Sequence, residues 1–241
     1  MQKRQGLIKS AAILCIFSLL TKGLGMIFRV YLSNRIGSEG MGLYQLVLSV
    51  YTLFTTFATA GLTVSVSRLT AESLENINPD NGLIAAKKIK NTGISFSLLI
   101  GFASLVVMLS LSKVLALFLL DDLRTVLPMK ILSLSMPFMA AAACYKGYFI
   151  ASRKVIIPAS AQLFEQLVKI GVTVLFFVIF LSSTTDIGKL TVGITAGLSI
   201  GEALSCIYLF LFDAFSKRKI KIAPNEKNVI HTKKSPELRC Q

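Results

Sequence analysis

Six long apolar runs constrain the fold of this chain more than any other feature of its sequence. They cover residues 10–33, 43–67, 92–119, 127–150, 158–182 and 189–213. A helix needs about 20 apolar residues to cross a bilayer, and each run reaches that length. Only 16% of the 241 residues are charged, whereas a water-soluble domain carries about 25%. We therefore expect an all-α, polytopic membrane protein with six transmembrane helices within residues 1–215.

The basic residues predict how these helices are oriented. Lysine and arginine concentrate at alternate connections, namely at the N-terminus and in residues 68–91, 146–154 and 217–221. Connections rich in Lys and Arg stay in the cytoplasm, so we expect both termini there, in a protein of the cytoplasmic membrane. Residues 216–241 are polar and basic and contain no apolar run, so we expect a disordered cytoplasmic tail.

The net charge of +14 does not by itself indicate a nucleic-acid partner. The basic residues gather at the ends of the runs, where anionic lipid head groups explain them, and they form no basic face with interleaved aromatic residues. The one histidine, His231, lies in the tail, and the four cysteines form no CxxC pair, which argues against a metal site. We find no nucleotide-binding, hydrolase or metalloprotease motif, so we expect neither an enzyme with catalytic residues nor a cofactor.

Two cations, Lys22 and Arg29, lie inside the first apolar run. A cation near the middle of a bilayer costs roughly 2.5–3.5 kcal/mol, so it persists mainly where it faces protein or a wet cavity. The two residues are one heptad apart, which places them on the same helix face about 10 Å apart. We therefore predict a cation-lined stripe that points into the helix bundle. Arg29 has an alternative, because its place near the helix end allows it to reach the outer interface.

Glycine and proline residues predict where the helices turn, bend and touch. The glycine-rich segment 37–42 permits a tight reversal between the first two helices. Pro137 lies within the fourth run, where it should kink or unwind the helix. Gly193, Gly197 and Gly201 recur every four residues in the sixth run and predict a flat face for close helix contact.

Two carboxylates lie within the last two runs. Glu165 and Lys169 are four residues apart in the order that favours an ion pair, and Glu165 could instead compete for a proton or a substrate cation. Glu202 lies near the middle of the sixth run, where a carboxylate is neutral, paired to a cation such as Lys22, or a proton or ion site. These alternatives stay open, and Glu202 counts among the candidates for substrate binding and for coupling.

Three segments resemble the start of the multidrug/oligosaccharidyl-lipid/polysaccharide (MOP) exporter superfamily. They read KGLG at 22–25, RIGSEGMGLYQ at 35–45 and YKGYFIASRK at 145–154. Within the superfamily they look most like the branch of stage V sporulation protein B and polysaccharide-biosynthesis flippases. The likeness covers residues 1 to about 215.

The resemblance implies a transporter of two six-helix lobes around a central cavity. Such proteins alternate access and move lipid-linked saccharides, including peptidoglycan precursors, to the outer leaflet. On this sequence the residues implied to meet the pyrophosphate are Lys22, Arg29 and Arg68. The family has about twice as many spans, so we expect an N-terminal lobe that pairs with a second-lobe chain or with itself. The alternatives are a cation-coupled multidrug exporter, which predicts an acidic cavity, and a non-transporting fragment or scaffold.

Overall fold

The computed structural model describes residues 2–59, 61–75, 79–118, 120–180 and 187–222. Its helices are α1 (Gln2–Thr59), α2 (Leu62–Leu74), α3 (Pro79–Phe118), η1 (Leu123–Thr125), α4 (Val126–Ser133), α5 (Met136–Ala151), α6 (Ile156–Phe180) and α7 (Ile187–Ile222). These described segments contain no strand, so the all-α prediction is confirmed. The chain divides into two compact units, Met1–Leu209 and Phe210–Gln241, and the helix bundle considered below is the first. The predicted tail lies mostly outside the described residues.

Several helices are long and apolar enough for membrane spans. Within the described residues, four helical stretches are long and apolar enough to cross a membrane, or five if the bent pair α4–α5 counts as one span. The first stretch, Ala12–Leu74, has 63 residues, which as helix correspond to about 95 Å, against a hydrocarbon thickness of about 30 Å. This length is enough for two of the predicted spans, and the total of six stays a prediction.

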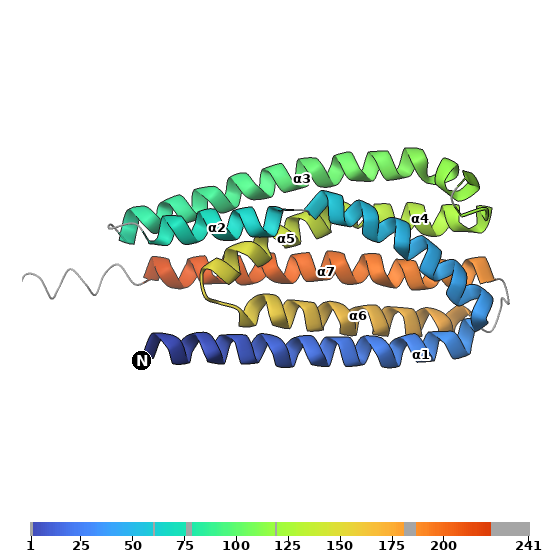
Figure 1. The fold of residues 1–241 in the computed structure, drawn as a ribbon, viewed down its shortest axis with the longest axis horizontal. Coiled ribbons are helices and arrows are strands. Elements are labelled where there is room, and N and C mark those ends of the chain that lie inside the picture. The colour runs from blue at the N-terminus through green and yellow to red at the C-terminus, as the bar shows by residue number, and fades with distance from the viewer. Residues whose placement is uncertain (1, 60, 76–78, 119, 181–186, 223–241) are drawn as a thin grey trace, which may run out of the picture. The chain divides into compact units, whose positions relative to one another are not determined.

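The two spans of the first stretch are separated at Gly37. This residue has φ 71° and ψ −176°, a combination that is open almost only to glycine. The first part of α1 runs to one end of the bundle, and the part after Gly37 turns back toward α2 (Figure 1). The reversal predicted in the glycine-rich segment is thereby confirmed.

The fourth span is broken close to the predicted proline. α4 ends at Ser133, α5 begins at Met136, and the two helices meet at 44°. Pro137 stands in the first turn of α5, where its missing N–H costs nothing because that group has no helical partner. The predicted kink is confirmed.

Glycines set how closely α5 approaches its neighbours. α5 packs against both α2 and α3, and α2 and α3 also touch each other (Figure 1). A Cβ added at Gly147 of α5 would lie 2.6 Å from the carbonyl oxygen of Thr63 in α2. A Cβ at Gly101 of α3 would lie 2.7 Å from Cα of Pro137. Only hydrogen fits at these two positions.

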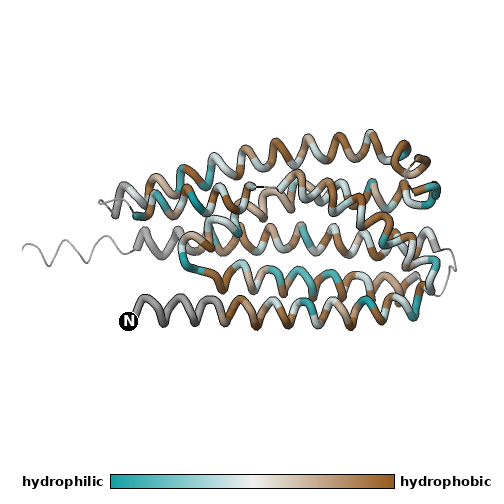
Figure 2. The backbone as a smooth tube through the Cα atoms, viewed as in Figure 1, coloured by the Kyte–Doolittle hydropathy of each residue, from teal (hydrophilic) through white to brown (hydrophobic). Residues whose placement is uncertain are grey.

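The surface of the bundle is that of a protein surrounded by lipid. Large apolar side chains are exposed along the helices, among them Phe57 at 76%, Val64 at 71% and Phe118 at 87%. Hydrophobic residues predominate along the lengths of the helices in Figure 2. A water-soluble protein rarely leaves so much apolar surface contiguous and uncovered. Composition, helix length and exposure therefore agree on a membrane protein.

Candidate functional site

A cavity of about 440 Å³ lies between α6 and both parts of α1, before and after Gly37, and α1 packs against α6. Its lining residues come from α1 and α6: Lys22, Gly25, Met26, Phe28, Arg29, Leu32, Tyr44, Leu48, Gln166 and Lys169. The volume falls within the range of about 300–1,000 Å³ that is usual for small-molecule sites. The cavity is therefore large enough for a polar group of a ligand.

Three cations line this cavity. Lys22 and Arg29 come from α1 and Lys169 comes from α6. Lys22 and Arg29, for which the sequence predicts a shared helix face, both border this space. Their side chains are exposed, whereas Lys169 is half-buried. Like charges that converge on one space repel each other, so the arrangement is most stable with an anion between them.

Glu165 forms its ion pair with a lysine of another helix. Nζ of Lys146 in α5 lies 3.7 Å from Oε2 of Glu165, and among the described residues no ion pair joins Glu165 to Lys169. The sequence favoured Lys169 as the partner from the spacing along one helix. The structure gives that position to Lys146 instead, because α5 packs against α6 and brings a second lysine to the carboxylate.

One side of the cavity is apolar and tightly packed. Phe28, Leu32 and Tyr44 are 5%, 1% and 3% exposed, and they belong to a hydrophobic cluster that also contains Phe177 and Ile194. This wall keeps water from one side of the cations, and a charge contact in such surroundings is stronger than one in bulk water. Gln166 and Tyr44 add neutral hydrogen-bonding groups to the lining.

Glu202 lies in a separate buried polar cluster. Its carboxylate is 6% exposed, and the hydroxyl of Tyr51 donates a hydrogen bond of 2.5 Å to Oε2. The same hydroxyl lies 2.9 Å from Oγ of Ser135, which stands at the break between α4 and α5. The cluster therefore joins α1, the broken span and α7. Among the described residues Glu202 forms no salt bridge, but its charge acts on Lys169 in the lining of the cavity.

Tyr51 and Ser135 were not among the residues predicted from the sequence. A tyrosine and a serine in apolar runs carry no local signal, because each occurs often in membrane helices without a functional partner. Their importance follows only from the packing that brings them to Glu202. A search for hydroxyls able to reach Glu202 would have found them, once the neighbouring helices were known.

Arg68 is not brought to the cavity. It lies in α2, where Nε is 3.0 Å from Oε1 of Glu72 one turn further along, and both side chains are exposed. The lining of the cavity comes from α1 and α6. The role of Arg68 toward a substrate therefore remains a prediction from the resemblance.

No group of three or more His, Cys, Asp and Glu side chains that could hold a metal ion occurs in the described part of the chain. The hydrogen-bonding groups at the cavity are instead cationic or neutral. Such a set of donors suits an anionic ligand rather than a metal.

Comparison with known proteins shows the family to which this chain belongs. The family described as "Polysaccharide biosynthesis protein" matches residues 7–232. The chain is also similar to Stage V sporulation protein B of Bacillus subtilis (strain 168), at 30% identity over 222 residues. That likeness covers 91% of this chain and 41% of the relative, so the chain spans less than half the length of the curated relative. No solved structure matches it. Because the family match extends over nearly the whole chain, this protein belongs to the polysaccharide biosynthesis family of MOP-type membrane proteins.

Proposed function

We propose that this chain forms one lobe of a flippase that moves a lipid-linked saccharide across the cytoplasmic membrane. In this proposal the cavity between α1 and α6 binds the pyrophosphate that joins the lipid to the sugar. The observation that carries it is the convergence of Lys22, Arg29 and Lys169 from two helices on one cavity. None of the described lining residues is acidic.

The chemistry of pyrophosphate fits these donors. The guanidinium of Arg29 can form two parallel hydrogen bonds to one phosphate, and the two ammonium groups act as point charges on the other oxygens. A hydrogen bond to a charged group contributes about 1.5–3 kcal/mol. The apolar wall formed by Phe28 and Leu32 limits competition from water. Three such contacts are enough to select a pyrophosphate over an uncharged lipid.

The alternative function, a cation-coupled drug exporter, is less well supported. A cationic drug requires a carboxylate in its cavity, and the two central carboxylates have other partners. Glu165 is paired with Lys146, and Glu202 accepts the hydrogen bond of Tyr51. We assign Glu202 to ion or proton coupling, where a buried carboxylate is useful, rather than to contact with the saccharide lipid.

Binding of a simple prenyl pyrophosphate tests the cavity. Farnesyl pyrophosphate, farnesyl monophosphate and farnesol would be titrated against the purified chain in detergent by microscale thermophoresis. We expect affinity to fall in that order. Lys22→Ala, Arg29→Ala and Lys169→Ala should each weaken the pyrophosphate by roughly 10- to 150-fold, which corresponds to the loss of one charged contact.

A matched control uses a lysine outside the cavity. Lys113 is exposed on α3 and does not line the space, so Lys113→Ala should bind like the parent chain. Unchanged affinity in all three cavity variants, with the proteins still inserted in membranes, would refute the assignment. Weakening of all three ligands equally would indicate a fold defect rather than a lost anion contact.

Transport by a lobe requires a partner, because a two-lobed cavity cannot be enclosed by one lobe. Residues 1–241 would be expressed alone, and then with a separate second-lobe chain, in cells depleted of their own flippase. Rescue only by the pair is expected. Rescue by the single chain would indicate a self-assembling half-transporter. Failure of both, with the chain in the membrane, would favour a non-transporting fragment or scaffold.

A further inference from the structure

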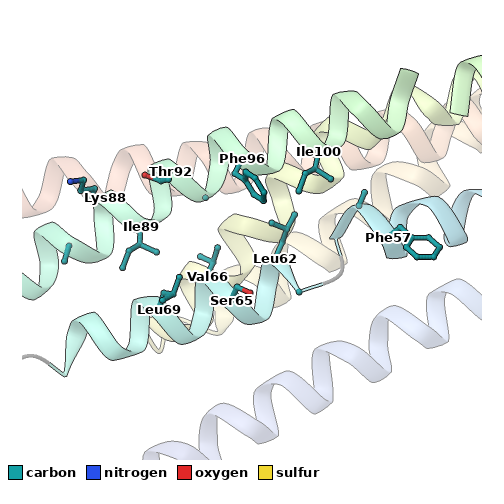
Figure 3. Close-up of a pocket in the computed structure, with 14 residues that line it drawn as sticks. Phe57, Leu62, Ser65, Val66, Leu69, Lys88, Ile89, Thr92, Phe96 and Ile100 are labelled. Atoms are coloured by element: carbon teal, nitrogen blue, oxygen red, sulfur yellow. The ribbon is translucent and has the colours of Figure 1, made fainter. Parts of the chain in front are cut away.

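A second cavity, a groove of about 590 Å³, lies on the bundle between α2 and α3 and reaches the end of α1. Figure 3 shows Ile89, Phe96 and Ile100 of α3 directed toward α2 across this groove, whereas the ammonium group of Lys88 points away from α2. The lining is largely apolar: Phe57, Ala58, Gly61, Leu62, Ser65, Val66, Leu69, Ala85, Lys88, Ile89, Thr92, Gly93, Phe96 and Ile100. It shares no residue with the cationic cavity.

The dimensions of the groove suit a single hydrocarbon chain. Its α3 wall extends from Ala85 to Ile100, which is about 22 Å along a helix. One leaflet of the hydrocarbon core is about 15 Å deep, so an acyl chain of that leaflet can lie along about two thirds of the groove.

The charge of the groove indicates which lipid it takes. Lys88 is the one charged side chain among the described lining residues. It is exposed and lies toward the end of the groove opposite Phe57 (Figure 3). A lysine at the end of an apolar groove can lay its stem along the apolar surface and present its ammonium group at the level of lipid phosphates. The polar end and the apolar length together match one lipid molecule.

We propose that this groove binds one acyl chain of an anionic phospholipid, with the lipid phosphate held at Lys88. The predicted orientation places the lysine-rich end of α3 in the cytoplasmic leaflet, where anionic lipids create a negative surface potential. The bound lipid fills the space between α2 and α3. This site is independent of the proposed transport function, because it lies on other helices than the pyrophosphate cavity.

The absence of tryptophan from the sequence makes a direct test available. Phe96→Trp places a single fluorescent reporter in the groove, and Phe102→Trp places one on the same helix outside its lining. The two phenylalanines are 58% and 57% exposed, so they form a matched pair. Each variant would be reconstituted in phosphatidylcholine vesicles containing increasing fractions of phosphatidylglycerol with brominated acyl chains, which quench tryptophan on contact.

Selective binding predicts separate quenching curves for the two reporters. The fraction of brominated phosphatidylglycerol that quenches half of the fluorescence should be about fivefold lower for the tryptophan at position 96 than for the tryptophan at position 102. This factor is the one expected for a single lysine near an anionic surface. Lys88→Ala should bring the two curves together, whereas Lys113→Ala should leave them apart. With brominated phosphatidylcholine the curves should coincide.

Three results would overturn the proposal. Coinciding curves in brominated phosphatidylglycerol would mean that the groove exchanges lipid like the rest of the surface. A tryptophan at position 96 that no brominated lipid quenches would mean that protein, such as a second copy of the chain, covers the groove. If the groove of Lys88→Ala still prefers phosphatidylglycerol, Lys88 does not hold the lipid phosphate.

Discussion

Replacement of Gly197 by alanine should destabilise the bundle, although alanine is the better helix former. A Cβ at this position of α7 would overlap Oγ1 of Thr173 in α6 and lie 3.2 Å from the carbonyl oxygen of Lys169. The Cβ would also lie 3.4 Å from the backbone nitrogen of Thr173. Rotation of a side chain cannot move these backbone atoms, so relief requires α6 and α7 to separate. Overpacking of this kind costs about 1–3 kcal/mol, and the gain in helix propensity returns only about 0.5–1 kcal/mol.

A glycine in the facing helix supplies the control. Gly171 of α6 is exposed, and a Cβ there would meet no atom within 4 Å. Gly171→Ala should therefore stabilise the protein by about 0.5–1 kcal/mol through helix propensity alone. At about 2–4 °C per kcal/mol, thermal unfolding in detergent should show Gly197→Ala roughly 1–8 °C below the parent chain. Gly171→Ala should lie about 1–4 °C above it. The two substitutions are chemically identical, so opposite signs isolate the packing.

A double variant identifies the colliding atom. Oγ1 of Thr173 is buried and makes no hydrogen bond within the described part of the chain, so its removal sacrifices no polar contact there. Gly197→Ala should therefore cost much less in the background of Thr173→Ala than alone, with a coupling energy of about 0.5–3 kcal/mol. Stabilisation by Gly197→Ala, or strict additivity with Thr173→Ala, would refute the close contact.

Two further substitutions test other features by thermal unfolding. Tyr51→Phe should lower stability by about 1.5–3 kcal/mol, because it leaves the buried carboxylate of Glu202 without the hydroxyl that donates to it. Tyr31→Phe, on the same helix, should have little effect, and equal losses would contradict this. Gly37→Ala should cost about 1–3 kcal/mol from backbone strain alone, because its φ is 71° and a Cβ would meet nothing within 4 Å. A Cβ at Gly23 would also meet no atom within 4 Å, and this residue has a helical conformation. Gly23→Ala should therefore stabilise the chain, and a loss of stability in this variant would argue against backbone strain as the cause at Gly37.

Features that depend on the order of residues along the chain could be predicted from the sequence. The apolar runs predicted the helices, because the length of a span follows from bilayer thickness. Gly37 and Pro137 predicted the reversal and the break, since each acts on its own backbone. The glycine stripe predicted a close helix contact, and Gly193 and Gly197 indeed face Phe176 and Thr173 of α6.

Features that depend on which helices become neighbours could not be predicted in this way. Lys169 was assigned to Glu165 because they lie one turn apart, yet the better-placed lysine comes from α5. The hydrogen bond from Tyr51 to Glu202 joins residues 151 positions apart. The second apolar run also looked continuous, whereas Gly61, with φ 79°, separates α1 from α2. These features depend on the packing of helices that are far apart in the chain, and this packing cannot be predicted from a single sequence.

The glycines of α7 also limit how the cationic cavity can change shape. They hold α7 against the backbone of α6 near Glu165 and Lys169, and closely packed surfaces deform in discrete steps rather than continuously. α6 and α7 should therefore move as one rigid body, so that Lys169, on the α6 side of the cavity, keeps its position relative to α7.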